Sequence, residues 1–200
     1  MNKTGASAWL RRAEIALFVV GGTALGWAAV TTAARVVYQA EQEQSFSRLE
    51  RAATAGPGLL AVARVDTGAD PLLLGRIEIA RLGLSAIVRE GDDDATLSVA
   101  VGHIPGTAPL GERGNVALAG HRDSFFRPLR GIRLHDTIRI STPLRQDDYV
   151  VDSTQVVGPK DIRVLEATRD GRLTLVTCYP FGFVGHAPKR FIVRASLVRD

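Results

Sequence analysis

The hydrophobic pattern changes sharply after the first part of the chain. Residues 15–34 read IALFVVGGTALGWAAVTTAA, a run of 20 residues without a charged side chain. As an α-helix, such a run rises about 30 Å, which is the thickness of the hydrocarbon core of a bilayer. The pattern therefore predicts a transmembrane anchor, which we place over residues 15–37, with residues 1–14 on its N-terminal side.

Basic residues flank this apolar segment unevenly. Lys3, Arg11 and Arg12 precede it, whereas Arg35 follows it. The positive-inside rule then predicts a cytoplasmic N-terminus, a single pass through the cell membrane and an extracytoplasmic remainder. A cleaved signal peptide and a buried core helix are the alternatives, and the full spanning length favours a retained anchor over both.

The next segment is polar and then rich in turn residues. Residues 38–53 contain many good helix formers, which is typical of a juxtamembrane helix or stalk. Gly56, Pro57, Gly58, Gly68 and Pro71 follow, and they indicate a flexible spacer over residues 54–71. We therefore predict a stalk and linker over residues 38–71 and a folded domain over residues 72–200.

The domain itself has a β pattern. Short runs that alternate apolar and polar residues are separated by turn residues, which is typical of a barrel or sandwich. In the last run, Phe191, Val193, Ala195 and Leu197 fall on one face. A short helix is predicted over residues 92–99 and a brief turn over residues 124–130. The expected strands are 76–82, 84–90, 115–120, 136–141, 148–157, 172–178 and 190–198.

Composition excludes several kinds of protein. The net charge is +4, but the basic residues are scattered and aromatic residues make up 6% of the chain, so a nucleic-acid partner is not expected. A single cysteine excludes an intramolecular disulfide and a zinc site made of several thiolates. Asp92, Asp93 and Asp94 are adjacent, as in a helix cap, and we expect neither a metal site nor another cofactor.

The single cysteine, Cys178, lies in the sequence TLVTCYPF at the end of a predicted strand. Pro180 and Gly182 follow and interrupt any regular ladder, so the thiol is expected to face a cleft. An ordinary thiol with a pKa near 8.5 is only about 3% ionised at pH 7, and a nucleophilic cysteine therefore needs a basic or cationic partner. Arg190 begins the next predicted strand and is expected near the same rim.

A general acid or base is expected to be one of the four histidines. His121 follows the predicted strand NVALAG and, like Cys178, lies at a strand end. His103, His135 and His186 lie in other turn-rich segments. Taken singly, each is more often a structural or surface histidine than a catalyst, so position and neighbouring motifs must choose among them.

Three segments resemble the sortases, the cysteine transpeptidases that attach surface proteins to a bacterial envelope. The segments are GNVALAGHRDSFFRPLRGI, TLVTCYPF and APKRFIVRA, in this order. The similarity covers the chain from about Leu74 onward, and the details CYPF, GHAPKRFIV and VGHIPGT look most like class D. It implies a mostly β fold: a sortase-type eight-stranded β-barrel with short helices, preceded by a transmembrane helix.

The resemblance also implies roles for individual residues. Cys178 is expected to attack an LPxTG-like sorting signal after Thr, His121 to act as general acid and base, and Arg190 to stabilise the developing oxyanion. Thr177, in the TLxTC signature, is expected to line the substrate site. The implied partners are proteins that carry such a signal and an amine acceptor on a peptidoglycan precursor or a pilin.

Three other interpretations share features with this sequence. An L,D-transpeptidase usually holds its cysteine in an SHGC-like context, whereas the neighbours here are Thr177 and Tyr179. A papain-like peptidase places its cysteine before its histidine, but His121 precedes Cys178. A non-catalytic, membrane-anchored β-domain stays the main alternative, because a motif match is a hypothesis about chemistry.

Overall fold

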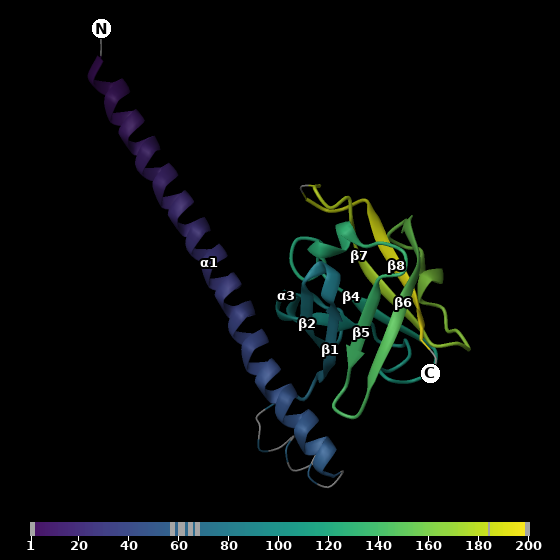
Figure 1. The fold of residues 1–200 in the computed structure, drawn as a ribbon. Helices are drawn as coiled ribbons and strands as arrows, with labels where there is room; N and C mark the ends of the chain where they lie inside the picture. The colour runs from purple at the N-terminus through teal and green to yellow at the C-terminus, as the bar shows by residue number, and fades with distance from the viewer. Residues whose placement is uncertain are drawn as a thin grey trace. The chain divides into compact units, whose positions relative to one another are not determined.

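The structure is a computed structural model that describes residues 3–56, 59, 63, 66, 69–183 and 185–198 (Figure 1). Most of the predicted spacer over residues 54–71 lies outside the described residues. The chain forms two compact units, Met1–Val37 and Tyr38–Asp200. We describe each of them by itself.

The first unit is the apolar part of helix α1, which runs from Lys3 to Ala55. Its large apolar side chains are exposed, including Phe18 at 70% and Trp27 at 74%. The hydroxyl of Thr23 donates to the carbonyl oxygens of Val19 and Val20, so this polar group is satisfied within the helix. By length and composition, this helix is the one candidate membrane span among the described residues, as the sequence predicts.

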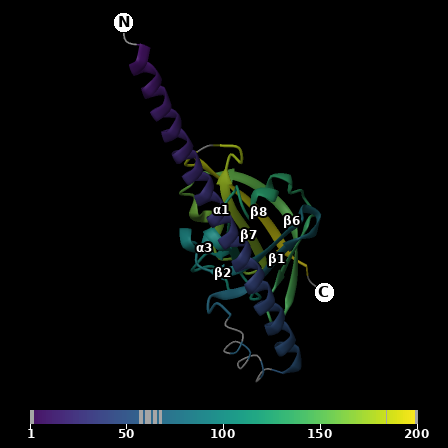
Figure 2. The same ribbon diagram turned by 90° about the vertical axis from the view of Figure 1, so that its left-hand side faces the viewer.

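The second unit contains a closed β-barrel (Figures 1 and 2). Its described residues form eight strands in the order β1-β2-β3-β4-β7-β8-β6-β5. The strands are β1 (Leu73–Ile79), β2 (Leu84–Glu90), β3 (Val101–His103), β4 (Asn115–Ala119), β5 (Thr137–Ser141), β6 (Gln146–Val157), β7 (Arg172–Tyr179) and β8 (Lys189–Leu197). The short helices are η1 (Ala80–Leu82), α3 (Asp94–Val99), η2 (Arg127–Gly131) and η3 (Ile162–Leu165). The expected mostly β fold, an eight-stranded barrel with short helices, is confirmed.

Alternate side chains along each strand point inward and fill the barrel interior. In β8, Val193 and Ala195 are fully buried in the core, and Phe191 and Leu197 pack against it, so the predicted inward face is confirmed. Most neighbouring strands are antiparallel, but β2 is parallel to β3, and β4 is parallel to β7, with Ala119 opposite Val176. The ends of β4 and β7 consequently lie at the same end of the barrel.

The part of α1 from Tyr38 to Ala55 packs onto the barrel within the second unit. Phe46 and Leu49 are 0% and 1% exposed and form a small core with Leu73 and Ile87. The side chain of Gln39 accepts from the backbone N–H of Ile87 and donates to the carbonyl of Val99. The predicted helix over residues 38–53 is therefore present, and it is part of the compact fold.

Tyr38 and Asp70 tie the start of this helical segment to the chain that enters β1. The Tyr38 hydroxyl donates to the Asp70 carboxylate at 2.7 Å, and the Arg89 guanidinium lies 2.9 Å from the same carboxylate. Partial burial opposes the charge of Asp70, but the Leu72 N–H, the Tyr38 hydroxyl and the Arg89 charge outweigh it and lower the pKa of Asp70. These contacts hold the start of the helical segment, at Tyr38, against the chain that enters β1.

Candidate active site

Strands β7 and β8 bring Cys178 and Arg190 together. The two residues are direct partners in the antiparallel ladder. Side chains of directly opposed residues lie on the same face of a sheet. Leu173 and Leu175 of β7 belong to the core, so Cys178, three positions beyond Leu175, falls on the outer face. Both Cys178 and Arg190 are partly exposed there.

The end of β4 positions His121 beside them. The backbone N–H of Gly120 donates to the carbonyl of Val176 in β7 at 3.2 Å, which extends the parallel pairing by one residue. A Cβ at Gly120 would lie 2.8 Å from the Phe126 ring, so glycine lets the chain turn tightly over this buried aromatic side chain. The carbonyl of His121 then accepts the N–H of Phe126 at 3.1 Å, which closes the turn.

Thr177 lies beneath this turn. Its side chain is 2% exposed, and its hydroxyl donates to the carbonyl of Gly120 at 2.7 Å. We expected Thr177 to line the substrate site, but it is absent from the pocket lining and its hydroxyl already has a partner. Its observed contact supports the segment that carries His121, and a direct contact with substrate stays a prediction.

One pocket of about 410 Å³ unites the three predicted catalytic side chains. Cys178, His121 and Arg190 all line it. Their elements, β7, the end of β4 and β8, are far apart in sequence and converge at one end of the barrel. The other lining residues are Asp94, Arg122, Asp123, Gly185, His186 and Ala187.

Sequence reasoning did not select Arg122, Asp123 or His186 for this pocket. We expected His121 to be the general acid and base, and the structure brings His186 to the same pocket. Arg122 and Asp123 had no signal of their own except that they follow His121 directly. Among the four histidines, the pocket therefore contains His121 and His186.

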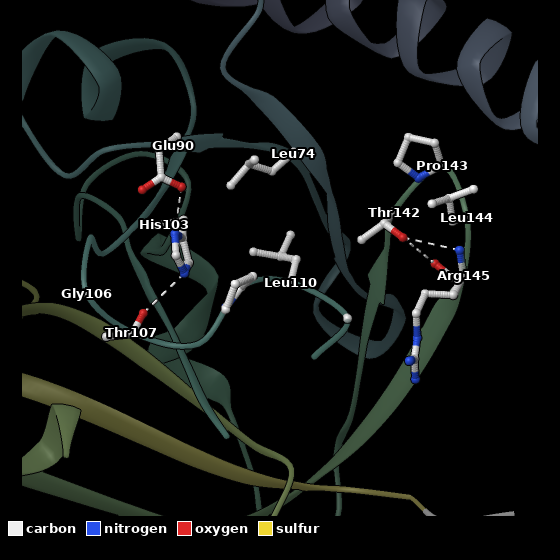
Figure 3. A pocket seen from close by; sticks show the side chains of 12 residues that line it. Leu74, Glu90, His103, Gly106, Thr107, Leu110, Thr142, Pro143, Leu144 and Arg145 are labelled. Carbon is white, nitrogen blue, oxygen red and sulfur yellow. Dashed lines mark hydrogen bonds and ion pairs between the residues drawn. The ribbon is translucent and has the colours of Figure 1, made fainter. Parts of the chain in front are cut away.

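His103 and His135 lie elsewhere. His103 is 5% exposed, and its Nδ1 lies 2.8 Å from the Glu90 carboxylate (Figure 3). Its Nε2 lies 3.0 Å from the Ala108 carbonyl oxygen. Both ring nitrogens are occupied, as in a structural histidine. His135 is exposed in the turn before β5, with a φ of 68°.

His103 borders a second pocket, of about 560 Å³, at the other end of the barrel. Figure 3 shows its walls, where Leu74 and Leu110 lie between the Glu90–His103 pair and the β5–β6 turn at Thr142. Glu90 and His103 end β2 and β3, and these strand ends face away from the end that carries Cys178. This pocket is separate from the candidate active site.

The acidic run before α3 is a helix cap. Asp93 accepts the N–H of Thr96 at 3.0 Å and the Thr96 hydroxyl at 3.0 Å, and these hydrogen bonds lower its pKa. The predicted short helix over residues 92–99 is thus present as α3. Among the described residues, no group of three or more His, Cys, Asp or Glu side chains could hold a metal ion. That the protein needs no metal or cofactor stays a prediction.

Comparisons with known proteins give a consistent result. A family model described as Sortase domain matches residues 77–198. The chain is 32% identical to Sortase D of Bacillus subtilis (strain 168) over 125 residues, which span 62% of this chain and 63% of that protein, less than two thirds of its length. This relative agrees with the expected likeness to class D.

Solved structures share the fold. A Clostridium perfringens Sortase D5 transpeptidase aligns with a TM-score of 0.63 at 24% identity, over 80% of this chain and 99% of that one. Sortase C-1 from Actinomyces oris aligns with a TM-score of 0.60 at 28% identity, over 64% and 75%. Because the family model covers more than half of the chain, this protein belongs to the sortase family.

Proposed function

We propose that this protein is a membrane-anchored cysteine transpeptidase with Cys178 as its nucleophile. The observation that carries the proposal is that Cys178, His121 and Arg190 line one pocket at one end of the barrel. In acyl transfer through a thioester, a thiol can act as the nucleophile, an imidazole as the general acid and base, and a guanidinium as the oxyanion donor. The membership of the chain in the sortase family supports the same chemistry.

In the proposed reaction, the Cys178 thiolate attacks the carbonyl carbon of Thr in an LPxTG-like signal. A C–S bond forms, the carbonyl oxygen becomes an oxyanion, and Arg190 donates to this oxygen. His121 protonates the amine of the leaving Gly as the peptide bond breaks, which leaves a thioester on Cys178. His121 then takes a proton from the acceptor amine as that amine attacks the thioester and releases the thiolate.

The hydrogen bonds of the Arg190 side chain support its proposed role as the oxyanion donor. Its Nη1 donates to the carbonyl oxygens of Ala187 and Lys189 at 3.2 and 3.0 Å, so the guanidinium is held at the start of β8. No other hydrogen bond of this guanidinium is found among the described residues, and its remaining N–H groups stay available for a substrate oxygen. A fixed donor is worth more than a mobile one, because it needs no reorganisation in the transition state.

The proposed substrates are proteins with a C-terminal LPxTG-like signal, and the proposed acceptor is an amine of a peptidoglycan precursor or a pilin. The apolar part of α1 supports anchoring in the cell membrane. The basic residues that precede this part, Arg11 and Arg12 among them, support a cytoplasmic N-terminus and an extracytoplasmic barrel. No nucleic-acid partner is proposed.

A mass-spectrometric assay tests the proposal. The full chain in detergent micelles is incubated with an LPxTG-type peptide, with and without a small amine. We expect a mass increase on Cys178 that corresponds to the acylated enzyme, and a transpeptidation product only when the amine is present. The Cys178→Ala variant should give neither, whereas a binding domain would leave the wild-type chain unmodified and the peptide intact.

A further inference from the structure

Arg122 connects the two segments that carry the proposed catalytic groups. It follows His121 directly, yet its Nη2 donates to the carbonyl oxygens of Phe183 and Gly185 at 2.7 and 2.8 Å. Both carbonyls belong to the connection between β7 and β8, which joins Cys178 to Arg190. The Arg122 guanidinium also lies over the Phe183 ring, 6.0 Å from its centroid.

Phe181, near the start of the β7–β8 connection, packs against the core and against the Phe191 ring, but the described residues between Phe181 and β8 have little other support. Gly182, Phe183, Gly185 and His186 are exposed. The Phe183 N–H donates to the Pro180 carbonyl at 3.3 Å, and nearer to β8 the connection is held by Arg190 through the Ala187 carbonyl. Two charge-assisted hydrogen bonds from one guanidinium are therefore a large part of what holds this segment in place.

The other terminal nitrogen of Arg122 is unsatisfied. Its Nη1 is buried and has no hydrogen-bond partner among the described residues. Arg122 also lines the pocket of Cys178 and His121. A buried N–H of a cation without an acceptor is unfavourable, so a substrate oxygen that comes within hydrogen-bond distance of Nη1, once the atoms that cover it move aside, would be stabilised by this donor.

We propose that Arg122 fastens one wall of the substrate pocket and binds the substrate. Its Nη2 fastens the β7–β8 connection to the segment of His121, and its Nη1 donates to a carbonyl oxygen of the bound sorting peptide. The second half of this inference rests on the proposed function, whereas the first half does not. Arg122 is a positioning and binding residue, and the bond-making steps belong to Cys178, His121 and Arg190.

Hydrogen–deuterium exchange of the full chain in micelles tests the fastening without any substrate. In Arg122→Ala, the amide of Phe183 should exchange about tenfold faster or more, because opening no longer breaks two charge-assisted hydrogen bonds. Arg113→Ala is the matched control, since Arg113 is an exposed arginine in the connection between β3 and β4. Unchanged exchange at Phe183 in the folded Arg122→Ala chain would overturn the proposal.

Steady-state kinetics test the binding half. Loss of a hydrogen bond from a charged donor predicts a KM for the sorting peptide that is about 10- to 100-fold higher in Arg122→Ala. A residue with a purely structural role would lower the active fraction, and thus kcat, and leave KM unchanged. Arg122→Lys keeps the charge but not the planar fork, so it should recover part of the loss.

The two measurements separate the possible failures. If the wild-type chain forms no thioester with any peptide, the proposed function fails, and the exchange at Phe183 still decides whether Arg122 fastens the connection. Faster exchange with an unchanged KM would overturn the contact with substrate. Thermal denaturation of each variant verifies that Arg122→Ala is folded, and Arg122→Lys provides the same comparison if it is not.

Discussion

Cys178 and Arg190 face one another across the β7–β8 ladder, one residue before its last pair, Tyr179 and Lys189. Their Cβ atoms are therefore about 4.5–5.5 Å apart by the geometry of antiparallel strands. A thiol and a guanidinium that are paired by strand register need no loop movement to meet. The sheet, rather than the connection that follows it, sets their spacing.

Substitution of Arg190 tests whether its donors matter beyond its charge. Arg190→Lys keeps the charge but loses the planar donor fork, so we expect kcat for thioester formation to fall about 10²–10³-fold, as when an oxyanion donor is removed. Single-turnover mass spectrometry of acylated Cys178 measures this rate. Arg194→Lys, on the same strand, is the control, and equal losses in both variants would argue against a specific role for Arg190.

Two histidines compete for the role of general acid. We expect His121→Ala to lower kcat by about 10²–10⁴-fold, the usual contribution of a positioned acid or base, and His186→Ala to lower it only slightly. His121 is held by the turn that Gly120 and Phe126 form, whereas His186 is exposed on the β7–β8 connection. Steady-state kcat of both variants and of the wild type, measured at several pH values, checks this prediction. If His186→Ala is the more damaging change, the assignment of the acid moves to His186.

The strands with strong alternation could be predicted from the sequence. Six of the expected runs, among them residues 84–90 and 172–178, coincide with strands to within about two residues, and the first, residues 76–82, ends in helix η1. Strand β3, at Val101–His103, was missed because three residues carry no measurable period. The parallel pairing of β2 with β3 and of β4 with β7 was also beyond local patterns, because it depends on contacts between distant segments.

The parts of the candidate site that depend on a rare residue type or on a motif could be predicted from the sequence. Cys178 is the single thiol, and the motif around His121 separated it from the other histidines. Arg122 and the burial of Thr177 could not be foreseen, because they depend on how the chain turns after β4. The packing of Phe46 was also not predicted. Residues 38–53 are mostly polar, which indicates a stalk, and their small apolar face is evident only in the structure.

Gly120→Ala tests whether the turn after β4 positions His121. The new methyl group would lie 2.8 Å from the buried Phe126 ring, so either the ring or the backbone of His121 must shift. We expect kcat to fall at least about tenfold and the free energy of unfolding to fall by about 1–3 kcal/mol. Gly158→Ala is the control, because no atom lies within 4 Å of its added Cβ. Full activity in Gly120→Ala would show that this turn tolerates the displacement.

Phe46→Ala tests whether the helical segment over residues 38–53 belongs to the folded domain. Phe46 is fully buried against the chain at Leu73 and Ile87, and loss of a buried Phe side chain costs about 3–5 kcal/mol. Thermal denaturation of the full chain should show a clear decrease in Tm. Leu134→Ala, at a side chain that is 56% exposed, should leave Tm nearly unchanged. Equal Tm values for Phe46→Ala and the wild type would mean that the barrel is stable without this contact.

A buried carboxylate before β5 gives a prediction about pH. Asp136 is 8% exposed, forms hydrogen bonds with the Arg81 guanidinium and accepts the N–H of Arg133 at 2.8 Å. The hydrogen bonds from Arg81 are the main cause that lowers the pKa of Asp136 below its ordinary value.

A lowered pKa in the folded state means that the ionised carboxylate stabilises the fold. This contribution is complete above the ordinary pKa of about 3.9 and is lost as the pH falls from there through the pKa of the folded state. Asp136→Asn should therefore lower Tm by about 2–8 °C at pH 7, with a difference from the wild type that shrinks below about pH 4. Thermal denaturation at pH 7, 5 and 3 measures this difference. A difference of the same size at all three pH values would contradict a stabilising ion pair between Asp136 and Arg81. It would indicate that only the shape of the Asp136 side chain matters.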